Sequence, residues 1–393
     1  MLPEQSQYSS DAIDIPQVTT LPSRQPDSKL RSVIEAVFDI EEAINPPIPN
    51  VEVQYIGRLR VPSEGVLDQL DPALAQLNFH AYLSQDEATG KHILTVFQGR
   101  FATRELPWWP NLLLLVLTIL SLLFVGAGTQ AGIDGREVKD FSDIHLLDGW
   151  PYALSLMLIL GAHELGHYFA AKRHRVTNVS LPYFIPMPFG LFGTLGAFIM
   201  MRGPIKNRKV LFDVGVAGPL AGLFFAIPIL IIGLATSKIQ EVPKNEDTAR
   251  EGNSLVYAAA KIAVFGRFVP DGNEDVFINQ LATAGWTGLF VTALNLIPLG
   301  QLDGGHVIYT LFGRRVRKLY VPIIGTFAAL TVLVSLSWAF WTLLLLLFGW
   351  QHATPLDDVT PLDGRRRMIG IIALIIFILV FVPNPIQIIP AGS

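Results

Sequence analysis

The sequence contains no cysteine and few charged residues, and both deficits narrow the classes of protein that it can encode. Without cysteine there is neither a disulfide framework nor a thiolate metal site, so any metal must be held by histidine, aspartate or glutamate. Only 16% of the 393 residues are charged and 51% are hydrophobic, whereas a soluble domain is about one quarter charged. The sequence therefore indicates a membrane protein, and its net charge of −4 gives no basis for a nucleic-acid partner.

The N-terminal part of the chain is the most polar. Residues 1–28 are rich in Ser, Thr, Gln and Pro and lack the apolar core of a secretory signal, so we expect a disordered tail. Residues 29–104 are predicted to form a small soluble α/β module. Apolar residues recur at helical spacing over 29–44, and 63–76 also reads as a helix. The other segments alternate as strands, the last two as a hairpin: 51–61, 78–85 and 91–99.

Apolar segments near the roughly 20 residues that span a bilayer follow the module. They lie at 108–127, 151–171, 210–236, 281–298 with a continuation to 312, 319–350, and 368–384. Residues 319–350 fit either one long tilted helix or a tight pair of short ones. We therefore predict a polytopic α-helical membrane protein of six or seven spans. Its predicted parts are a first span with an acidic loop (105–149), a membrane core (150–312) and C-terminal spans (313–393).

The distribution of Lys and Arg predicts the orientation of these spans. Basic residues follow the second span, precede the third and follow the fourth, whereas the loops 128–150 and 237–280 are acidic. The positive-inside rule places the basic loops and the N-terminal module in the cytoplasm. Arg365–Arg367 reach that side only if 319–350 is a pair of helices.

The segment "GAHELGHY" carries three ionisable side chains inside the second apolar span. His163 and His167 are four residues apart, so both imidazoles lie on one helix face and can reach one zinc ion. Glu164 lies next along the helix, close enough to contact a zinc-bound water without being a ligand. Buried histidines are often ordinary core residues, but each unpaired ionisable group at membrane depth costs about 2–3 kcal/mol or more. A zinc site is therefore favoured.

A catalytic zinc site needs a third protein ligand, and "NLIPLGQLDGGH" (295–306) offers Asp303. Pro298, Gly300 and the glycine pair after Asp303 predict a helix break, and irregular backbone at membrane depth is tolerated only where it lines a cavity. By itself an aspartate here is typical of a helix N-cap. Beside the His–Glu–His helix, it is the expected third ligand.

These motifs resemble the site-2 protease family of intramembrane zinc metalloproteases. HELGH in a span, N-x-x-P-x-x-x-L-D-G-G downstream, and the intervening "GTLGAFI" and "AGPLAG" carry the resemblance over about 150–312. The soluble module and the extra spans are most like the cyanobacterial and plastid branch, which implies a bacterial inner membrane or a thylakoid membrane. The resemblance implies one zinc per chain held by His163, His167 and Asp303, with Glu164 as the general base and Asn295 holding the substrate or the oxyanion.

A peptidase acting on membrane-anchored proteins must also hold an unwound substrate segment, because a transmembrane helix hides its backbone in internal hydrogen bonds. The Pro- and Gly-rich segment 184–202 predicts a strand or re-entrant loop at membrane depth, and a strand edge can bind an extended peptide. A plain space-filling loop is the alternative. The strand candidates are Gly193, Thr194, Leu195, Gly196 and Ala197.

Several residues around these motifs have more than one interpretation. The glycines of "GVAGPLAG" (215–222) indicate close helix packing or, less simply, a flexible gate for substrate. Asp213, which lies beside Arg208 and Lys209 in the sequence, is expected to form an ion pair at the membrane surface rather than to be catalytic, and His174 is expected to be solvated.

Two other functions compete with a protease. A zinc-binding membrane protein that holds partners without cutting them would not need a base beside its metal, so Glu164 argues against it. A transporter would use the same cluster on an ion pathway, but transporters commonly show repeated halves and no internal repeat is visible here.

Overall fold

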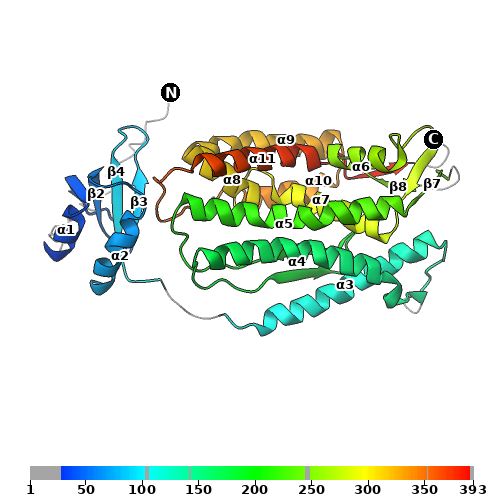
Figure 1. Ribbon diagram of the computed structural model, residues 1–393, viewed down its shortest axis with the longest axis horizontal. Coiled ribbons are helices and arrows are strands. Elements are labelled where there is room, and N and C mark those ends of the chain that lie inside the picture. The colour runs from blue at the N-terminus through cyan, green and yellow to red at the C-terminus, as the bar shows by residue number, and fades with distance from the viewer. Residues whose placement is uncertain (1–27, 102–105, 141–142, 244–247, 352, 390–393) are drawn as a thin grey trace, which may run out of the picture.

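The computed structural model describes residues 28–101, 106–140, 143–243, 248–351 and 353–389. The expected disordered tail therefore lies outside the described residues, except for Ser28. Figure 1 shows a small α/β module at one end and a bundle of helices lying side by side along the long axis. The last described strand, Ile386–Ile389, pairs with Thr248–Glu251 at the opposite end of the bundle from the module.

The module is one antiparallel sheet with two helices. Its strand order is β1-β2-β4-β3, so β1 and β3 are the edge strands. Apolar side chains from all six elements form a common core that includes the fully buried Leu30, Tyr55 and Leu83. The elements are α1 (Ser28–Glu35), β1 (Phe38–Ile44), β2 (Val51–Leu59), α2 (Val66–Gln76), β3 (Phe79–Gln85) and β4 (His92–Gln98).

The predicted helix over 29–44 is wrong in its second half. The chain leaves the helix after Glu35, and Val37 donates a backbone hydrogen bond to Ile34 in the turn. The following residues pair with β2, from Phe38 opposite Leu59 to Ile44 opposite Gln54. Ile34 and Phe38 are both buried, so the apolar positions were identified correctly. However, pairing with β2 gave residues 38–44 an extended conformation in place of a helical one.

Among the described residues, eight helices of the bundle overlap the predicted apolar segments. They are α3 (Trp109–Ile133), α4 (Trp150–Arg173), α5 (Arg208–Ala235), α7 (Gln280–Asn295), α8 (Asp303–Phe312), α9 (Tyr320–Leu333), α10 (Trp338–Phe348) and α11 (Gly364–Val380). Within the described ranges, three continuous helical stretches are long and apolar enough to cross a membrane: Trp109–Ile133, Arg208–Ala235 and Asp303–Leu333. A total of six or seven spans stays a prediction.

Residues 320–348 form two short helices, α9 and α10, that pack against each other. The tight pair is therefore the arrangement present, which is the one that brings Arg365–Arg367 to the side of the other basic loops. Leu146–Gly149 before α4 and Gly313–Leu319 between α8 and α9 are short 3-10 helices that connect larger elements.

The segment 184–202 forms a hairpin rather than a helix. Strand β5 (Tyr183–Met187) pairs antiparallel with β6 (Gly193–Phe198), from Tyr183 opposite Phe198 to Met187 opposite Gly193. The hairpin packs against α3, and β6 also contacts α4, which carries the His–Glu–His motif. The strand candidates 193–197 therefore lie on an ordered strand beside the predicted zinc helix.

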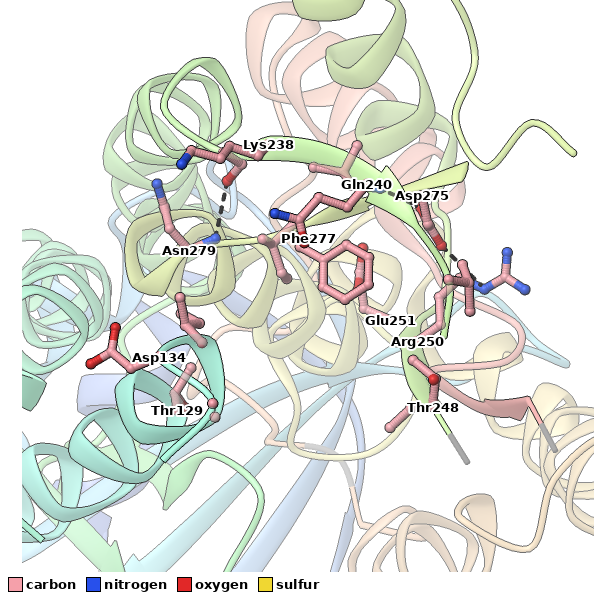
Figure 2. A pocket seen from close by; sticks show the side chains of 18 of the residues that line it. Thr129, Asp134, Lys238, Gln240, Thr248, Arg250, Glu251, Asp275, Phe277 and Asn279 are labelled. Atoms are coloured by element: carbon pink, nitrogen blue, oxygen red, sulfur yellow. Dashed lines mark hydrogen bonds and ion pairs between the residues drawn. The ribbon is translucent and has the colours of Figure 1, made fainter. Parts of the chain in front are cut away.

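The end of the bundle farthest from the module has a fold of its own that periodicity did not predict. Two small two-stranded sheets, β7–β9 and β8–β10, and the C-terminal end of α3 surround a cavity of about 700 Å³ (Figure 2). A further helix, α6, packs against α5 and α11 at this end. Charged groups on its wall are paired: Arg250 Nε lies 3.4 Å from Asp275 Oδ2, and the Tyr257 hydroxyl donates to Glu251. The elements are β7 (Lys238–Glu241), β8 (Thr248–Glu251), α6 (Leu255–Phe265), β9 (Glu274–Phe277) and β10 (Ile386–Ile389).

Candidate metal centre

Three predicted ligands come together between α4 and the start of α8. His163 Nε2 and His167 Nε2 are 3.1 Å apart. Asp303 reaches both, with Oδ2 3.2 Å from His163 Nε2 and Oδ1 3.3 Å from His167 Nε2. Both histidines are buried, and the Asp303 side chain is 14% exposed. One nitrogen of each imidazole and the carboxylate therefore point at a common centre.

The spacing of these donor atoms fits a tetrahedral ion. Four ligands at the 2.0–2.2 Å typical of zinc are separated from one another by about 3.3 Å. His167 Nδ1 lies 2.7 Å from the carbonyl oxygen of Val214, so this nitrogen donates a hydrogen bond and Nε2 keeps its lone pair. The donor set of two imidazoles and one carboxylate is one that zinc uses in catalytic sites.

A break between α7 and α8 places Asp303, as its proline and glycines predicted. Helix α7 ends at Asn295, and α8 begins at Asp303 itself. A Cβ atom on Gly304 would lie 2.0 Å from the Leu296 carbonyl oxygen, and one on Gly305 would lie 2.3 Å from that of Gly300. Only glycine permits the loop to fold back so closely on the start of α8, so the glycine pair is needed to present the carboxylate.

The glycines of α5 make room for the histidines. A Cβ atom on Gly218 would lie 2.1 Å from His167 Nε2, and one on Gly222 would lie 3.3 Å from His163 Cβ. Helices α4 and α5 are in extensive contact along their length. Close packing is therefore the role that the structure gives this motif, and the atoms packed against Gly218 and Gly222 belong to predicted ligands.

Glu164 and Asn295 both face the cluster. The Glu164 carboxylate is buried, with Oε1 4.0 Å from His163 Nε2. The Asn295 side-chain nitrogen lies 3.3 Å from the same His163 atom. Both residues line a cavity of about 420 Å³ together with His163. A group held in this cavity would contact an acid–base residue and an amide at once.

Strand β6 forms one wall of this cavity. Four of the five strand candidates line it: Thr194, Leu195, Gly196 and Ala197. Gly193 instead faces α3, where its carbonyl oxygen accepts a hydrogen bond from the Ser121 hydroxyl. Among the described residues β6 pairs with β5 alone, so its second edge has no strand partner there. Phe340 and Trp341 of α10 line the same cavity, which no sequence signal indicated.

At the basic end of the core, Asp213 forms the expected ion pair, but its partners are not its sequence neighbours. Asp213 does not pair with Arg208 or Lys209; it accepts from His174 Nε2 at 2.8 Å and from the Arg366 guanidinium at 2.6 Å. His174 is therefore not simply solvated. Arg366 lies in the first turn of α11, 153 residues beyond Asp213 in the chain, so no local sequence pattern could have predicted this pair.

Comparison with known proteins agrees with the motifs. Residues 151–338 match the model of peptidase family M50. "Probable zinc metalloprotease EGY2, chloroplastic" of Arabidopsis thaliana is 28% identical over 247 residues, covering 62% of this chain and 44% of that protein. "Probable zinc metalloprotease EGY1, chloroplastic" of the same plant is 29% identical over 299 residues, covering 68% and 53%. The chain thus spans about half the length of these relatives. No solved structure matches.

Proposed function

Because the chain is related through residues 151–338 to peptidase family M50, the site-2 proteases, we propose that it is an intramembrane zinc metalloprotease. Its substrate would be a membrane-anchored protein, cut within or near its transmembrane segment. The observation that carries this proposal is the convergence of His163, His167 and Asp303 at separations of 3.1–3.3 Å beside a buried glutamate.

We assign one zinc ion per chain to these three side chains. When bound, zinc lowers the pKa of water from about 15.7 towards 7 and polarises a carbonyl group. The chain's contribution is to set the geometry: the Val214 carbonyl orients the His167 ring, and the Gly304–Gly305 turn presents Asp303. Because the ligand side chains are buried, bulk water can reach the metal site only through the cavity.

Glu164 is the proposed general base. Its carboxylate lines the cavity without belonging to the converging set, so it is free to take a proton from water and later to deliver it to the leaving nitrogen. We assign to Asn295 the role of donating its amide hydrogen to the oxygen of the scissile carbonyl as charge develops there. This role is supported by its position on the cavity wall, with its side-chain nitrogen 3.3 Å from His163 Nε2.

Strand β6 is the proposed substrate-binding edge. A peptide that adds to the outer edge of β6 is extended, so its carbonyl groups are released from helical hydrogen bonds before cleavage. The residues from Thr194 to Ala197 would lie along such a peptide.

We further propose that the N-terminal module and the basic loops lie in the cytoplasm, in a bacterial inner membrane or a thylakoid membrane. The N-terminal module lies at the end of the bundle that carries Arg208, Lys209 and Arg366. This arrangement fits a protease that releases a cytoplasmic fragment of its substrate.

The test combines zinc content with cleavage. Wild type, Asp303→Ala and Glu164→Gln would be purified in detergent without chelators, and zinc per chain would be measured. Each would then be reconstituted in vesicles with tagged single-span membrane proteins. We expect about one zinc in wild type and Glu164→Gln, loss in Asp303→Ala, and cleavage by wild type alone.

The two readouts separate the alternatives. Wild type that binds zinc while Glu164→Gln cleaves as well as wild type would reject Glu164 as the base. A second outcome would favour a protein that holds partners without cutting them. In that case wild type binds zinc, but it cleaves none of the proteins that the Glu164→Gln variant captures. Absence of zinc in wild type would overturn the metal assignment.

A further inference from the structure

The segment 356–360 connects the N-terminal module to the membrane core by backbone hydrogen bonds. On one side, Leu83 of edge strand β3 donates to the Leu356 carbonyl at 2.7 Å and accepts from the Asp358 amide at 2.9 Å. On the other side, Leu356 and Asp357 donate to the carbonyls of Ile205 and Lys206 at 2.8 and 2.9 Å, just before α5. The segment thus lies between the module's sheet and the core, and Asp357 forms isolated parallel β-bridges with Leu83 on one side and Asn207 on the other.

Side chains reinforce this junction. Val359 packs against the module's apolar core, and the Thr360 hydroxyl donates to Ser63 at 2.9 Å. Lys206 and Lys209 form ion pairs with Asp68 and Glu64. These ion pairs are solvent-exposed on the module's side and contribute little, so the backbone bonds and the buried contacts define how the module docks.

Asp358 is the buried charge at the centre of the junction. Its side chain is 3% exposed, with Oδ1 2.9 Å from Arg208 Nε of α5. Its Oδ2 accepts from the Tyr309 hydroxyl of α8 at 2.9 Å and from Arg314 Nε at 3.2 Å. Arg314 also donates to the Tyr82 hydroxyl of strand β3 at 2.9 Å. One carboxylate therefore joins the module, α5 and α8.

Tyr309 and Asp303 belong to the same ten-residue helix. They are six positions apart, which corresponds to about 9 Å along the axis of α8. Tyr309 is fully buried, so its position is set by packing and by the Asp358 bond. Because a short helix moves as a unit, a shift at Tyr309 also moves Asp303, the first residue of α8. Metal ligands must be held to within about 0.5 Å, so such a shift would weaken zinc binding.

We propose that Asp358 is a positioning residue for Asp303, and that the docked N-terminal module acts on the metal centre through it. The module would hold segment 356–360, Asp358 would hold Tyr309, and α8 would present Asp303 at the distance that zinc requires. This inference rests on the proposed function, because it takes Asp303 to be a zinc ligand.

The experiment measures zinc affinity of the full-length protein in detergent by competition with a chromophoric chelator, so no substrate is needed. Asp358→Asn is expected to raise the Kd for zinc about tenfold, and Tyr309→Phe, which removes only the hydroxyl, about threefold. Tyr82→Phe, one step further from the metal, should act in the same direction with a smaller effect.

Asp275→Asn is the matched control. Asp275 is also a buried aspartate between two cations, with Arg250 at 3.4 Å (Figure 2) and Lys261 at 3.9 Å. It lies on strand β9, which pairs with β7 at the other end of the bundle. Asp275→Asn and Asp358→Asn should both lower the melting temperature, but Asp275→Asn should change the Kd for zinc less than twofold.

Each result decides the inference. An unchanged Kd in Asp358→Asn and Tyr309→Phe, or an equal rise in Asp275→Asn, would overturn it while leaving the zinc site intact. If Asp358→Asn does not fold, Tyr309→Phe decides by itself. A wild type that binds no zinc, or an Asp303→Ala variant that binds it normally, would instead reject the proposed function and this inference with it.

Discussion

Two buried clusters of ionisable side chains lie at different depths of the bundle, and they differ in how their charges face one another. In the candidate metal centre, two imidazole nitrogens and a carboxylate converge within 3.3 Å. At the far end, Lys261 Nζ lies 3.5 Å from Glu251 and 3.9 Å from Asp275, so cation and anions alternate.

The comparison shows how function and structure use buried charge differently. Converging lone pairs are arranged for a positive ion, whereas alternating charges compensate one another and serve to hold elements in place. Lys261 joins α6 to strands β8 and β9 in this way, and it is completely buried. Removal of zinc should therefore affect the first cluster and abolish activity, whereas removal of Lys261 should affect the second cluster and lower stability.

Removal of zinc is expected to have the largest effect. Treatment with a strong chelator should abolish cleavage of a vesicle-embedded substrate, a loss of at least about 10³-fold, and added zinc should restore it. The rate of cleavage before and after zinc addition is the measurement. Full activity in metal-free protein would contradict the distinction between the clusters.

Lys261→Met should act at the other cluster and on stability. It leaves Glu251 and Asp275 buried without their shared cation, which costs about 3–5 kcal/mol of stability. Unfolding followed by tryptophan fluorescence would report a lower melting temperature, while zinc per chain should stay at the wild-type value. Loss of zinc in a folded Lys261→Met protein would show that the two clusters are coupled.

Glycine-to-alanine substitutions test the packing of the metal centre without touching a ligand. Gly218→Ala should weaken zinc binding about 100-fold, because its Cβ would meet His167 Nε2 at 2.1 Å. Gly222→Ala should have a smaller effect, since its contact with His163 is 3.3 Å.

The control for this series lies on α4 itself. A Cβ atom on Gly161 would meet nothing within 4 Å, so Gly161→Ala should leave zinc affinity unchanged. Chelator competition gives all three values. Equal effects at Gly161 and Gly218 would mean that helix propensity, and not space for His167, governs the result.

The smallest effect is expected at the exposed rim of the module. Asp68→Ala removes the pair with Lys206, whose side chains are 65% and 50% exposed, and should change stability by less than about 1 kcal/mol. Limited proteolysis of the module should be unchanged. Release of the module by this substitution would show that ion pairs, not the 356–360 segment, hold it.

Much of the candidate site could be predicted because local geometry generates it. A helix brings residues four apart to one face, so the His–Glu–His spacing already implies converging imidazoles. Likewise, Pro298 and the glycines after Asp303 cannot continue a helix, and the chain breaks there. The family resemblance rests on the same local motifs and is confirmed by the match over residues 151–338.

The rest depended on contacts between residues far apart in the chain. Whether 38–44 is strand or helix was decided by pairing with β2, and Asp213 found His174 and Arg366 instead of its sequence neighbours. The sequence by itself determined the apolar segments, the metal-binding residue types and their local spacing, since these follow from backbone periodicity. Only the tertiary structure decided that Gly218 clears space for His167 and that Asp358 links the module to α8, because both depend on which distant surfaces pack together.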